Sequence, residues 1–560
     1  MILCIACLAW TLLNLFLAGY TTLFDDEALF WMYSTRPVWG YYEHPPMVGM
    51  LIRLGAMLFS GELGVRLIFV ILNTVSLILI VITLRATNIP LLIALSVSLA
   101  AFSMSGFMAA PDPALAFWIS LYLYLYRKFT EQPHWITAVI WGVVMAAMMY
   151  SKYNAILVII LTLASNLRLF RQRLFYLAAL IALLAFLPHV IWLWQNNFST
   201  VMYHLSGRSD VGGFRWNNLG DFILGQLLLL GPFMWIFILL GCLFFHSSGT
   251  FDRSLMWIFW GIMIFFTVYL LKSRVEANWT APAFLPAIMI AYRYFENKSI
   301  RVHRWIYITA LVSFTGITLF RINLISSFIP LPSGSFLLRE LKHGKAWDDR
   351  MNRLSQEYPA VFISSYQWPS KMRFYTANPS YSLCAYNYHL TQFVFWPEME
   401  EELQGRTVML MAETPEFNKP YTTVHRFDDQ LVFYRTRLDH FLSFYTLPVI
   451  PEQKSYTTKP GDSLQAVISL INNRKELIRF SGNRFPETWV VYHLMKEDHF
   501  IVEEKPVLRL TESLNPGDTL RLRVQVPPVP EKGNFTIMFS LKTGDLISTR
   551  NGIFTPWKAE

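Results

Sequence analysis

Charged residues are scarce in this chain: Asp, Glu, Lys and Arg make up 15% of its 560 residues, whereas soluble globular domains carry about 25%. Hydrophobic residues make up 54% and aromatic residues 16%. This composition excludes a purely water-soluble protein and indicates a membrane protein. Cysteine is also rare: of four cysteines, the one close pair, Cys4 and Cys7, lies in an apolar run without a second pair or a nearby histidine. The sequence therefore predicts neither a disulfide framework nor a zinc cluster.

Phosphate-binding loops are missing as well. The chain contains no GxGxxG pattern and no P-loop, and "PDP" at 111–113 is not a DxD site, so we expect no nucleotide cofactor. The net charge of +9 could indicate a nucleic-acid partner. The basic residues lie in short loops between apolar runs, however, and membrane topology is the commoner cause of that pattern. We therefore expect no nucleic-acid binding.

Long apolar runs recur up to about residue 322 and then stop. A helix needs roughly 20 apolar residues to cross a bilayer. Candidate spans lie near 2–20, 65–84, 90–108, 112–127, 135–150, 154–167, 174–194, 220–245, 254–271, 279–294 and 305–322. The sequence thus predicts a polytopic α-helical membrane protein with about eleven transmembrane helices. The first run has no basic segment before it and no clear cleavage site, so we interpret it as a span rather than a signal peptide.

The loops between these spans differ in charge. If the N-terminus is cytoplasmic, the inner loops hold basic segments such as "RLFRQR" at 168–173, as the positive-inside rule expects. Nearly every acidic residue before position 322 then lies on the outer side. An odd number of spans places the rest of the chain on that side too. We therefore expect a multi-pass membrane protein whose C-terminal part lies outside the cytoplasm.

The chain after residue 322 has the pattern of a soluble region with two parts. Residues 323–445 combine a helical pattern over 347–358 with short strand-like runs, which predicts an α/β domain. Residues 446–560 contain only strand patterns separated by Pro-Gly-Asp turns, which favours an immunoglobulin-like β-sandwich. Residues 1–322 form the membrane domain in this division.

The segment 24–47, "FDDEALFWMYSTRPVWGYYEHPPM", places three acids directly after the first span. Aromatic residues suited to the lipid–water boundary follow them. The segment therefore predicts one or two helices along the membrane surface, with Asp25, Asp26 and Glu27 beside the lipid headgroups. A second acid, Asp112, lies between two spans on the same side. The plainer alternatives are solvated loop acids for the triplet and a helix N-terminal acid for Asp112.

Cations gather on the same predicted face. Taken singly, each is a loop or snorkelling charge. Together with the acids, they are typical of a site that holds a phosphate while a carboxylate takes a proton. The candidates are His44, Lys152, Arg208, Arg215, Lys272 and Arg274.

A spaced series of segments resembles a known family. The segments are "DDEALFW…GYYEHPPM", "PDPALAFW", "SKYNAIL", "NNFSTVMYHLSGR" and "EANWTAPAFLPA", which cover roughly residues 20–290. They are similar to the bacterial relatives of the dolichyl-phosphate-mannose protein mannosyltransferases and to the aminoarabinose transferases. The later segments "SSYQWPSKMRFYT" and "AYNYHLTQFVFW" resemble the soluble part of the same relatives. The resemblance implies the GT-C fold and a glycosyltransferase that takes a hexose, a pentose or an amino sugar from a polyprenyl-phosphate donor. Because the similarity is to bacterial members, it also implies a bacterial inner membrane with the C-terminal part in the periplasm. Direct displacement would invert the anomeric centre, which fits one base and no second carboxylate acting as nucleophile.

The resemblance also implies roles for individual residues. Asp26 corresponds to the proposed catalytic base, with Glu27 beside it, and Asp112 corresponds to the second loop acid. Where relatives often carry a lysine that contacts the lipid phosphate, this chain has His44, so a constant positive charge there is not expected. A divalent metal ion seen in some relatives would be held by Glu43 and His204.

Other functions stay open from the sequence alone. A transporter or flippase for a lipid-linked sugar would line its path with charges at mid-membrane, whereas the acids here lie in outer loops. A non-catalytic envelope scaffold would use the C-terminal strands and would tolerate loss of the Asp26 charge. The acceptor, whether a glycolipid such as lipid A, an envelope glycan or a protein, is not determined by the sequence, and neither is the sugar.

Overall fold

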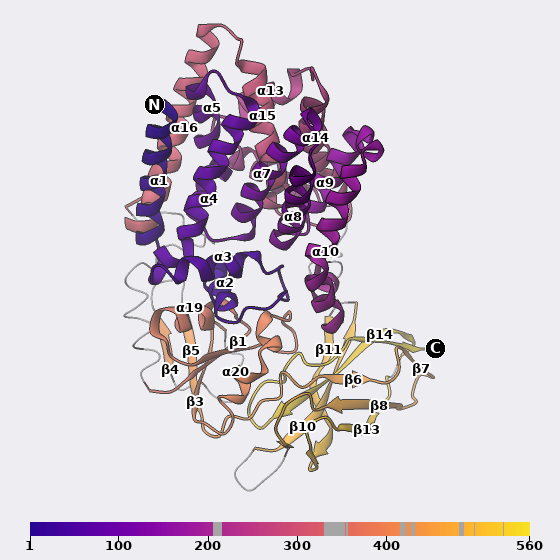
Figure 1. The fold of residues 1–560 in the computed structure, drawn as a ribbon. Coiled ribbons are helices and arrows are strands. Elements are labelled where there is room, and N and C mark those ends of the chain that lie inside the picture. Colours follow the sequence, from indigo (N-terminus) through magenta and orange to yellow (C-terminus); the bar gives the residue numbers. More distant parts are fainter. Residues whose placement is uncertain are drawn as a thin grey trace. The chain divides into compact units, whose positions relative to one another are not determined.

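The computed structural model describes residues 1–204, 215–326, 328–329, 353, 357–414, 421, 423–426, 432–480, 486–497, 499–529 and 531–560. The chain divides into two compact units, Met1–Pro332 with Glu340–Gly344, and Ser333–Arg339 with Lys345–Glu560. The first unit is helical and the second is mostly strand (Figure 1).

The helices of the first unit follow the predicted apolar runs. They are α1 (Ile2–Tyr20), α2 (Asp25–Thr35), α3 (Met47–Ala56), α4 (Gly61–Leu84), α5 (Ile89–Val97), α6 (Ala100–Ser105), α7 (Pro111–Glu131), α8 (Trp135–Ser151), α9 (Ala155–Ser165), η1 (Leu167–Arg171), α10 (Arg173–Gln195), α11 (Ser199–Met202), α12 (Trp216–Leu229), α13 (Trp235–Phe244), α14 (Thr250–Tyr269), η3 (Ala277–Ala283), α15 (Phe284–Phe295) and α16 (Ile300–Ser326).

In the part of the chain that the structure describes, five helices are long and apolar enough to cross a membrane: α1, α4, α10, α14 and α16. The polytopic helical prediction is confirmed, while the count of eleven crossings stays a prediction. After the first span, where one or two helices were predicted, the structure has the two short helices α2 and α3, which lie across one end of the longer helices (Figure 1).

Two predicted spans are broken into two helices each. The run 90–108 forms α5 and α6, and the run 220–245 forms α12 and α13. The second break falls at Gly231, which has a φ of +94° and so adopts a backbone conformation that favours glycine. A Cβ there would lie 2.5 Å from the carbonyl oxygen of Ser98, at the first break. The two interruptions therefore pack against each other, which no single run reveals.

The second unit begins with a five-stranded sheet in the order β2-β1-β3-β5-β4. Its strands are β1 (Ala360–Ile363), β2 (Ser380–Leu383), β3 (Val408–Ala412), β4 (Thr423–Arg426) and β5 (Val432–Leu438). The first three are mutually parallel, and helices α19 (Gln367–Thr376) and α20 (Pro397–Glu401) lie between them in sequence. The α/β prediction is confirmed, although the helix expected over 347–358 lies mostly outside the described residues.

The rest of this unit is a β-sandwich, as predicted. One sheet has the order β11-β10-β14-β15-β7 and a second has β13-β8-β6, with β12 and β9 as a separate pair. The strands are β6 (Val449–Pro451), β7 (Tyr456–Thr458), β8 (Leu464–Ile471), β9 (Ile478–Arg479), β10 (Thr488–Lys496), β11 (His499–Leu510), β12 (Ser513–Leu514), β13 (Thr519–Val526), β14 (Gly533–Thr543) and β15 (Thr555–Ala559). One core joins both sheets, with Ile468, Val526 and Phe539 fully buried in it. Along β13, Val524 and Val526 are buried while Arg523 and Gln525 are exposed, as the alternating pattern requires.

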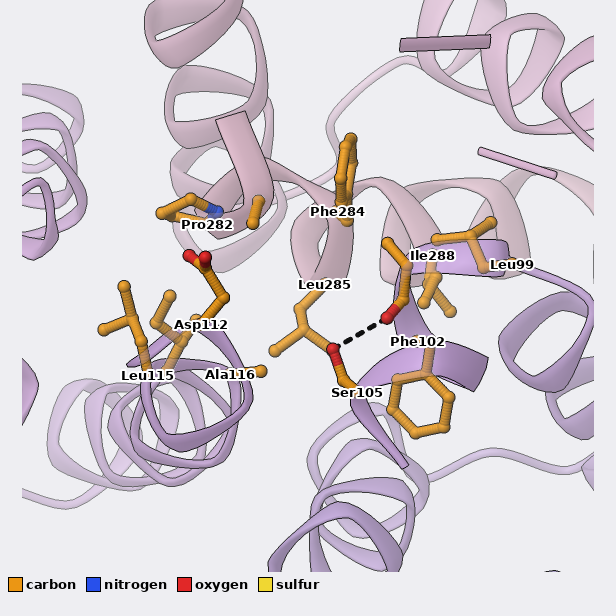
Figure 2. Close-up of a pocket in the computed structure, with 13 residues that line it drawn as sticks. Leu99, Phe102, Ser105, Asp112, Leu115, Ala116, Pro282, Phe284, Leu285 and Ile288 are labelled. Carbon is orange, nitrogen blue, oxygen red and sulfur yellow. Dashed lines mark hydrogen bonds between the residues drawn. The ribbon is translucent and has the colours of Figure 1, made fainter. Parts of the chain in front are cut away.

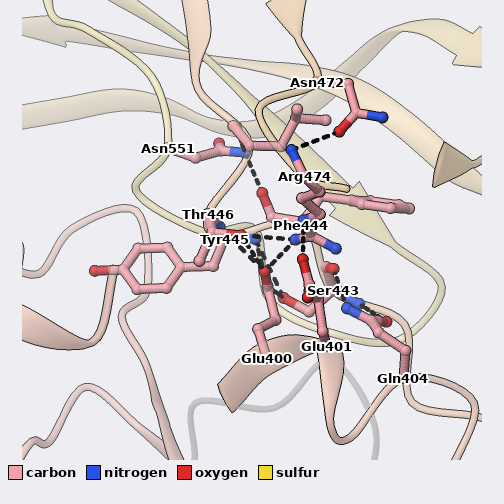
Figure 3. Close-up of polar contacts among 11 residues, drawn as sticks. Glu400, Glu401, Gln404, Ser443, Phe444, Tyr445, Thr446, Asn472, Arg474 and Asn551 are labelled. Carbon is pink, nitrogen blue, oxygen red and sulfur yellow. Dashed lines mark hydrogen bonds and ion pairs between the residues drawn. The ribbon is translucent and has the colours of Figure 1, made fainter. Parts of the chain in front are cut away.

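A buried carboxylate connects the two parts of this unit (Figure 3). Glu400, in α20, has no exposed surface and forms an ion pair with Arg474, which lies between β8 and β9. Its oxygens also accept hydrogen bonds from the Ser443 hydroxyl at 2.6 Å and from the Tyr445 and Thr446 backbone amides at 2.7 and 3.2 Å. A buried charge is costly unless it is paired and hydrogen-bonded in this way.

Candidate active site

The three predicted acids form the first turn of α2, where the helix dipole favours negative charge. Asp25 is 8% exposed and Glu27 is 1% exposed, whereas Asp26 between them is exposed. Only one of the three carboxylates therefore faces outward on the unit.

Glu27 is held by an arginine inside the helical core. The guanidinium of Arg66, which has no exposed surface, forms an ion pair with the Glu27 carboxylate and donates from Nε to its Oε1 at 2.8 Å. The same guanidinium donates to the carbonyl oxygens of Ala18 at 3.0 Å and Thr22 at 2.8 Å, at the end of α1. The Phe24 amide donates to Oε2 of Glu27 at 2.9 Å. Glu27 thus fixes the start of α2 against α1 and α4.

One further bond ties α2 to the start of α7. The backbone amide of Ala109 donates to Oε1 of Glu27 at 2.7 Å. Ala109 lies just before Pro111, where α7 begins, and Asp112 is in the first turn of that helix. Proline suits this position because its missing N–H would be unpaired there in any case. The two predicted acid sites are therefore joined through Glu27.

Asp112 forms an ion pair with a predicted cation. Lys152, at the end of α8, donates from Nζ to both carboxylate oxygens of Asp112, at 2.8 and 2.9 Å. Asn278, in η3, donates to Oδ2 at 3.2 Å. The side chains of Lys152 and Asp112 are 14% and 19% exposed. Asp112 thus joins α7, α8 and η3 at the edge of the unit.

A narrow, mostly apolar pocket lies beside Asp112 (Figure 2). Phe102 and Ser105 line it from α6, and Pro282 and Leu285 line it from the η3–α15 segment. The Asp112 carboxylate points toward Pro282. The acid therefore lies where a polar edge meets an apolar pocket, which is typical of a site for an amphipathic ligand.

The loop between α2 and α3 is held by its backbone carbonyls. The carbonyl of Trp39 contacts Nδ1 of His189 at 2.6 Å. The carbonyl of Tyr41 accepts from the Thr200 hydroxyl at 2.8 Å, and that of Glu43 contacts Nε2 of His204 at 3.0 Å.

These three acceptors belong to alternate residues of the loop. Their partners, His189, Thr200 and His204, all lie in or next to α10 and α11. The loop is thereby fixed against a separate part of the helical unit.

The predicted metal pair is brought close, but through the backbone. His204 reaches the carbonyl of Glu43, while the Glu43 carboxylate accepts a hydrogen bond from the Tyr33 hydroxyl at 2.5 Å. Among the described residues, no group of three or more His, Cys, Asp or Glu side chains could hold a metal ion. Catalytic metal sites use about three protein ligands, so these two residues alone do not fit one. The metal ion stays a prediction.

The other predicted cations occupy different positions. His44 is half-buried, with its ring 5.5 Å from that of Phe30 and 6.4 Å from that of His204. Lys272 and Arg274 are exposed in the segment that leads to η3. Arg208 lies outside the described residues.

Two residues that support this site were not predicted from the sequence. Arg66 lies within an apolar run and was counted as part of a span, although a charge inside such a run is rare and marks a functional or structural site. His189 lies in the apolar α10, where its Nε2 also contacts the Tyr153 hydroxyl at 2.8 Å. An ionisable residue within an apolar helix was the available signal in both cases.

The architecture matches the GT-C fold. The apo structure of ArnT from Cupriavidus metallidurans matches with a TM-score of 0.56 over 76% of this chain and 96% of that chain, at 13% identity. A second structure of that protein, bound to undecaprenyl phosphate, matches with a TM-score of 0.54 over 77% and 97% of the two chains, at 12% identity. At this identity the likeness shows the fold, and the fold predicted from the resemblance is confirmed.

Sequence comparisons point to the same group. The family model described as dolichyl-phosphate-mannose-protein mannosyltransferase matches residues 43–192. A lipid A galacturonosyltransferase, RgtD of Rhizobium johnstonii, is 24% identical over 292 residues, which are 48% of this chain and 60% of that relative. The chain thus aligns with about three-fifths of the relative's length. The resemblance to these bacterial GT-C proteins, inferred from motifs, is confirmed.

Proposed function

We propose that this protein is an inverting membrane glycosyltransferase. It moves a sugar from a polyprenyl-phosphate donor to a hydroxyl or phosphate acceptor on the periplasmic face. Its fold is that of a protein whose structure is known with undecaprenyl phosphate, and a relative is named for transfer to lipid A. A glycolipid of the lipid A type is therefore the acceptor that these likenesses favour.

The single observation that carries the proposal is the exposure of Asp26 between two buried acids. Glu27 and Arg66 fix the backbone of the first turn of α2, so the Asp26 carboxylate is presented at a defined place. The same network positions Asp112 through Ala109. A carboxylate that is solvent-accessible and rigidly supported suits a general base, because an acceptor hydroxyl can reach it.

The mechanism follows from these positions. An acceptor hydroxyl is a poor nucleophile until its proton is removed, and Asp26 takes that proton as the oxygen attacks the anomeric carbon. The bond between that carbon and the donor phosphate breaks, and direct displacement inverts the centre. Negative charge grows on the departing phosphate, so fixed cations stabilise the transition state more than the starting diester.

The cations differ in their fitness for that role. Lys152 already lies between Asp112 and the edge of the unit, at 14% exposure, where solvent screens its charge less than it would on the surface. Lys272 and Arg274 are exposed, so solvent screens their charges more strongly. Lys152 is therefore our first candidate for this cation, and Asp112 orients its ammonium group.

The topology completes the proposal. We place the protein in the bacterial inner membrane with the N-terminus in the cytoplasm and the C-terminal unit in the periplasm. This orientation puts α2, α3 and the Asp112–Lys152 pair on the periplasmic side. The basic loops, such as 168–173, then lie on the cytoplasmic side. The sugar is a hexose or a pentose.

Replacing Asp26 with asparagine tests the proposal. Asp26→Asn removes the charge with almost no change of shape, and loss of a general base lowers transfer by about 10²–10⁴-fold. Lipids from cells that carry the wild-type gene, its deletion or the variant at equal protein level are compared by mass spectrometry. One sugar-sized mass is expected to disappear from an acceptor in both the deletion and the variant.

The matched control is Asp221→Asn, the same change at an exposed acid on α12. This variant is expected to keep the modified lipid. If Asp26→Asn also keeps it, Asp26 is not the base. If the deletion leaves every lipid and glycan mass unchanged and instead alters the distribution of a lipid-linked sugar across the membrane, the protein is a transporter or a scaffold.

A further inference from the structure

The second unit contains a pocket that the proposed transfer reaction does not use. It has a volume of about 220 Å³, enough room for one sugar ring, and it lies at the carboxyl ends of two neighbouring parallel strands. Ser364 and Ser365 line it after β1, and Glu413 and Thr414 line it after β3. All of these residues belong to the α/β part of the unit.

The topology of the sheet makes this position special. The chain leaves β1 through α19 to β2 on one side, and then returns to β3 on the other side of β1. The direction of the strand order therefore reverses between β1 and β3. In open α/β sheets, ligands bind in the crevice beyond the carboxyl ends of the strands at such a reversal. The pocket occupies that crevice.

The polar side chains of the pocket are placed by hydrogen bonds. Trp368, in the first turn of α19, donates its indole N–H to Oε1 of Glu413 at 2.6 Å, so the carboxylate is held across the crevice between β3 and α19. The Ser365 hydroxyl donates to Oε1 of Gln367 at 2.9 Å, which orients the amide group of that side chain. A carboxylate, an amide and hydroxyl groups in fixed positions offer both donors and acceptors to a ligand rich in hydroxyl groups.

Aromatic side chains supply the apolar walls. The rings of Trp368 and Phe433 meet edge to face at 4.9 Å, and both side chains are almost fully buried. Tyr388 is partly exposed and also lines the pocket. An amphipathic ring of this kind packs against the C–H face of a sugar and leaves its hydroxyl groups to the polar side chains.

The charge of the pocket selects among hydroxyl-rich ligands. Its lining includes the carboxylate of Glu413, and among the described residues that line it none is basic; Arg550, outside the lining, donates its guanidinium to the backbone carbonyl of Tyr388 at 2.6 Å. A phosphate or an acidic sugar would be repelled by that carboxylate.

We propose that the pocket between the ends of β1 and β3 binds a single neutral sugar residue, through Glu413, Gln367 and Tyr388. This inference goes beyond the transfer reaction, since it concerns a separate site in the other unit.

Ligand-observed NMR tests the proposal directly. The full-length protein, in lipid nanodiscs free of glycoside detergents, is mixed with the methyl glycosides of glucose, galactose and mannose, and saturation transfer to each sugar is recorded. At least one neutral glycoside is expected to receive saturation transfer. Galacturonate, which differs from galactose by a carboxylate at C6, is expected to bind at least about tenfold more weakly because it opposes the Glu413 charge.

Two variants locate the binding. Glu413→Gln removes the charge and Gln367→Ala removes the amide, and each is expected to weaken the affinity by about tenfold, the effect of one lost hydrogen bond to a charged or buried group. Glu531→Gln, at a side chain that is 63% exposed in the β-sandwich, is the control and leaves binding unchanged. Thermal unfolding of each variant checks that it is folded, and Gln367→Ala carries the test if Glu413→Gln is not.

Several results would overturn the proposal. Saturation transfer to none of the three glycosides would exclude a neutral-sugar site. Binding that both folded pocket variants leave unchanged would place the sugar elsewhere, including in the proposed transferase site. Binding of galacturonate or inorganic phosphate as tight as that of the neutral glycosides would contradict the charge argument. Because none of these measurements uses transferase activity, the proposed transfer reaction can fail or hold independently.

Discussion

Arg66 shows how much depends on one side chain. Its guanidinium has no exposed surface, and it donates to Glu27 and to backbone carbonyls at the end of α1. Removing one partner of such a pair leaves an uncompensated buried charge, whereas removing both does not. The arrangement of the acidic turn thus depends on a residue that is not itself a candidate for the chemistry.

We expect Arg66→Met to lower the free energy of unfolding by about 3–5 kcal/mol, because Glu27 is then left buried without its partner. The double variant Arg66→Met with Glu27→Gln is expected to lose less than Arg66→Met alone. Thermal unfolding in one detergent measures both. Glu131→Gln, which breaks the exposed pairs of Glu131 with Arg85 and Arg127, is the control and changes stability by less than about 1 kcal/mol. If the double variant is less stable than Arg66→Met, the Glu27 carboxylate stabilises the fold in some way other than by pairing with Arg66.

His493 gives the second unit a pH dependence. The pKa of this histidine is lowered to about 4, mainly by burial, while Glu504 acts to raise it and Lys542 acts to lower it. Its Nδ1 accepts from the Glu504 amide at 3.3 Å, so the neutral ring with the proton on Nε2, beside the Ser540 hydroxyl at 2.7 Å, is the form that fits.

The unfolded chain binds a proton at this histidine below about pH 6.5, while the folded chain does so only below the lowered pKa. The unfolded state therefore holds more protons between these two values, and stability falls as the pH falls through that range. We expect a loss of roughly 3 kcal/mol between pH 7 and pH 4 from this residue, from the size of the shift. Unfolding of the C-terminal unit within the full chain, followed at several pH values, measures it. His493→Gln is expected to flatten this part of the curve, and an unchanged slope would assign the effect to other groups.

At the scale of elements, the loop between α2 and α3 depends on close packing. Gly40 lies between the docked residues Trp39 and Tyr41, and a Cβ at position 40 would lie 2.3 Å from the ring of Trp192, in α10. No larger residue fits without moving that ring. The three carbonyl contacts of the loop require this close approach.

Gly40→Ala is expected to lower the free energy of unfolding by about 1–3 kcal/mol, the usual cost of overpacking. It is also expected to reduce sugar transfer, because the loop carries Glu43 and His44, two of the predicted site residues. Gly220→Ala, in α12 where a Cβ meets nothing within 4 Å, is the control and is neutral or slightly stabilising. Thermal unfolding and the lipid mass spectra read both effects. A stable Gly40→Ala variant with normal transfer would mean that Trp192 moves freely.

The sequence predicted elements better than it predicted contacts. Apolar periodicity located the helical runs, and alternation along 520–526 located the buried face of β13, because each signal is local. The breaks at Ser98 and Gly231 were missed, since each depends on the other across the fold. The same holds for the site: Asp26, Asp112 and Lys152 carry recognisable patterns, whereas the charge of Arg66 within an apolar run marks a site but does not reveal that Glu27 is its partner.

At the scale of the whole molecule, each unit has its own core. In the second unit, the Glu400–Arg474 pair links the α/β part to the β-sandwich, so the two parts are expected to unfold together. If one part unfolds, the ion pair breaks and the other part is left with a buried, unpaired charge.

We expect Arg474→Met to uncouple these parts, because Glu400 then stays buried with its charge unpaired and the junction opens. Hydrogen exchange of the full chain is expected to show amides of 397–403 and 443–446 opening at least about tenfold faster, while β10 and β14 stay protected. Arg521→Met, at the exposed pair with Glu452, is the control and leaves exchange unchanged. Equal acceleration throughout the β-sandwich would instead show that Arg474 stabilises that part as a whole.

The Arg66–Glu27 pair also limits how this gene can change over generations. A single codon change at either position creates an intermediate with one buried, unpaired charge, and a loss of about 3–5 kcal/mol is a large share of the stability of a typical protein. Selection would remove most such intermediates before a second change could repair them. Glu27 and Arg66 are therefore expected to be retained together in descendants of this gene. The rigid support of the neighbouring Asp26 is then kept while other residues of the helices change.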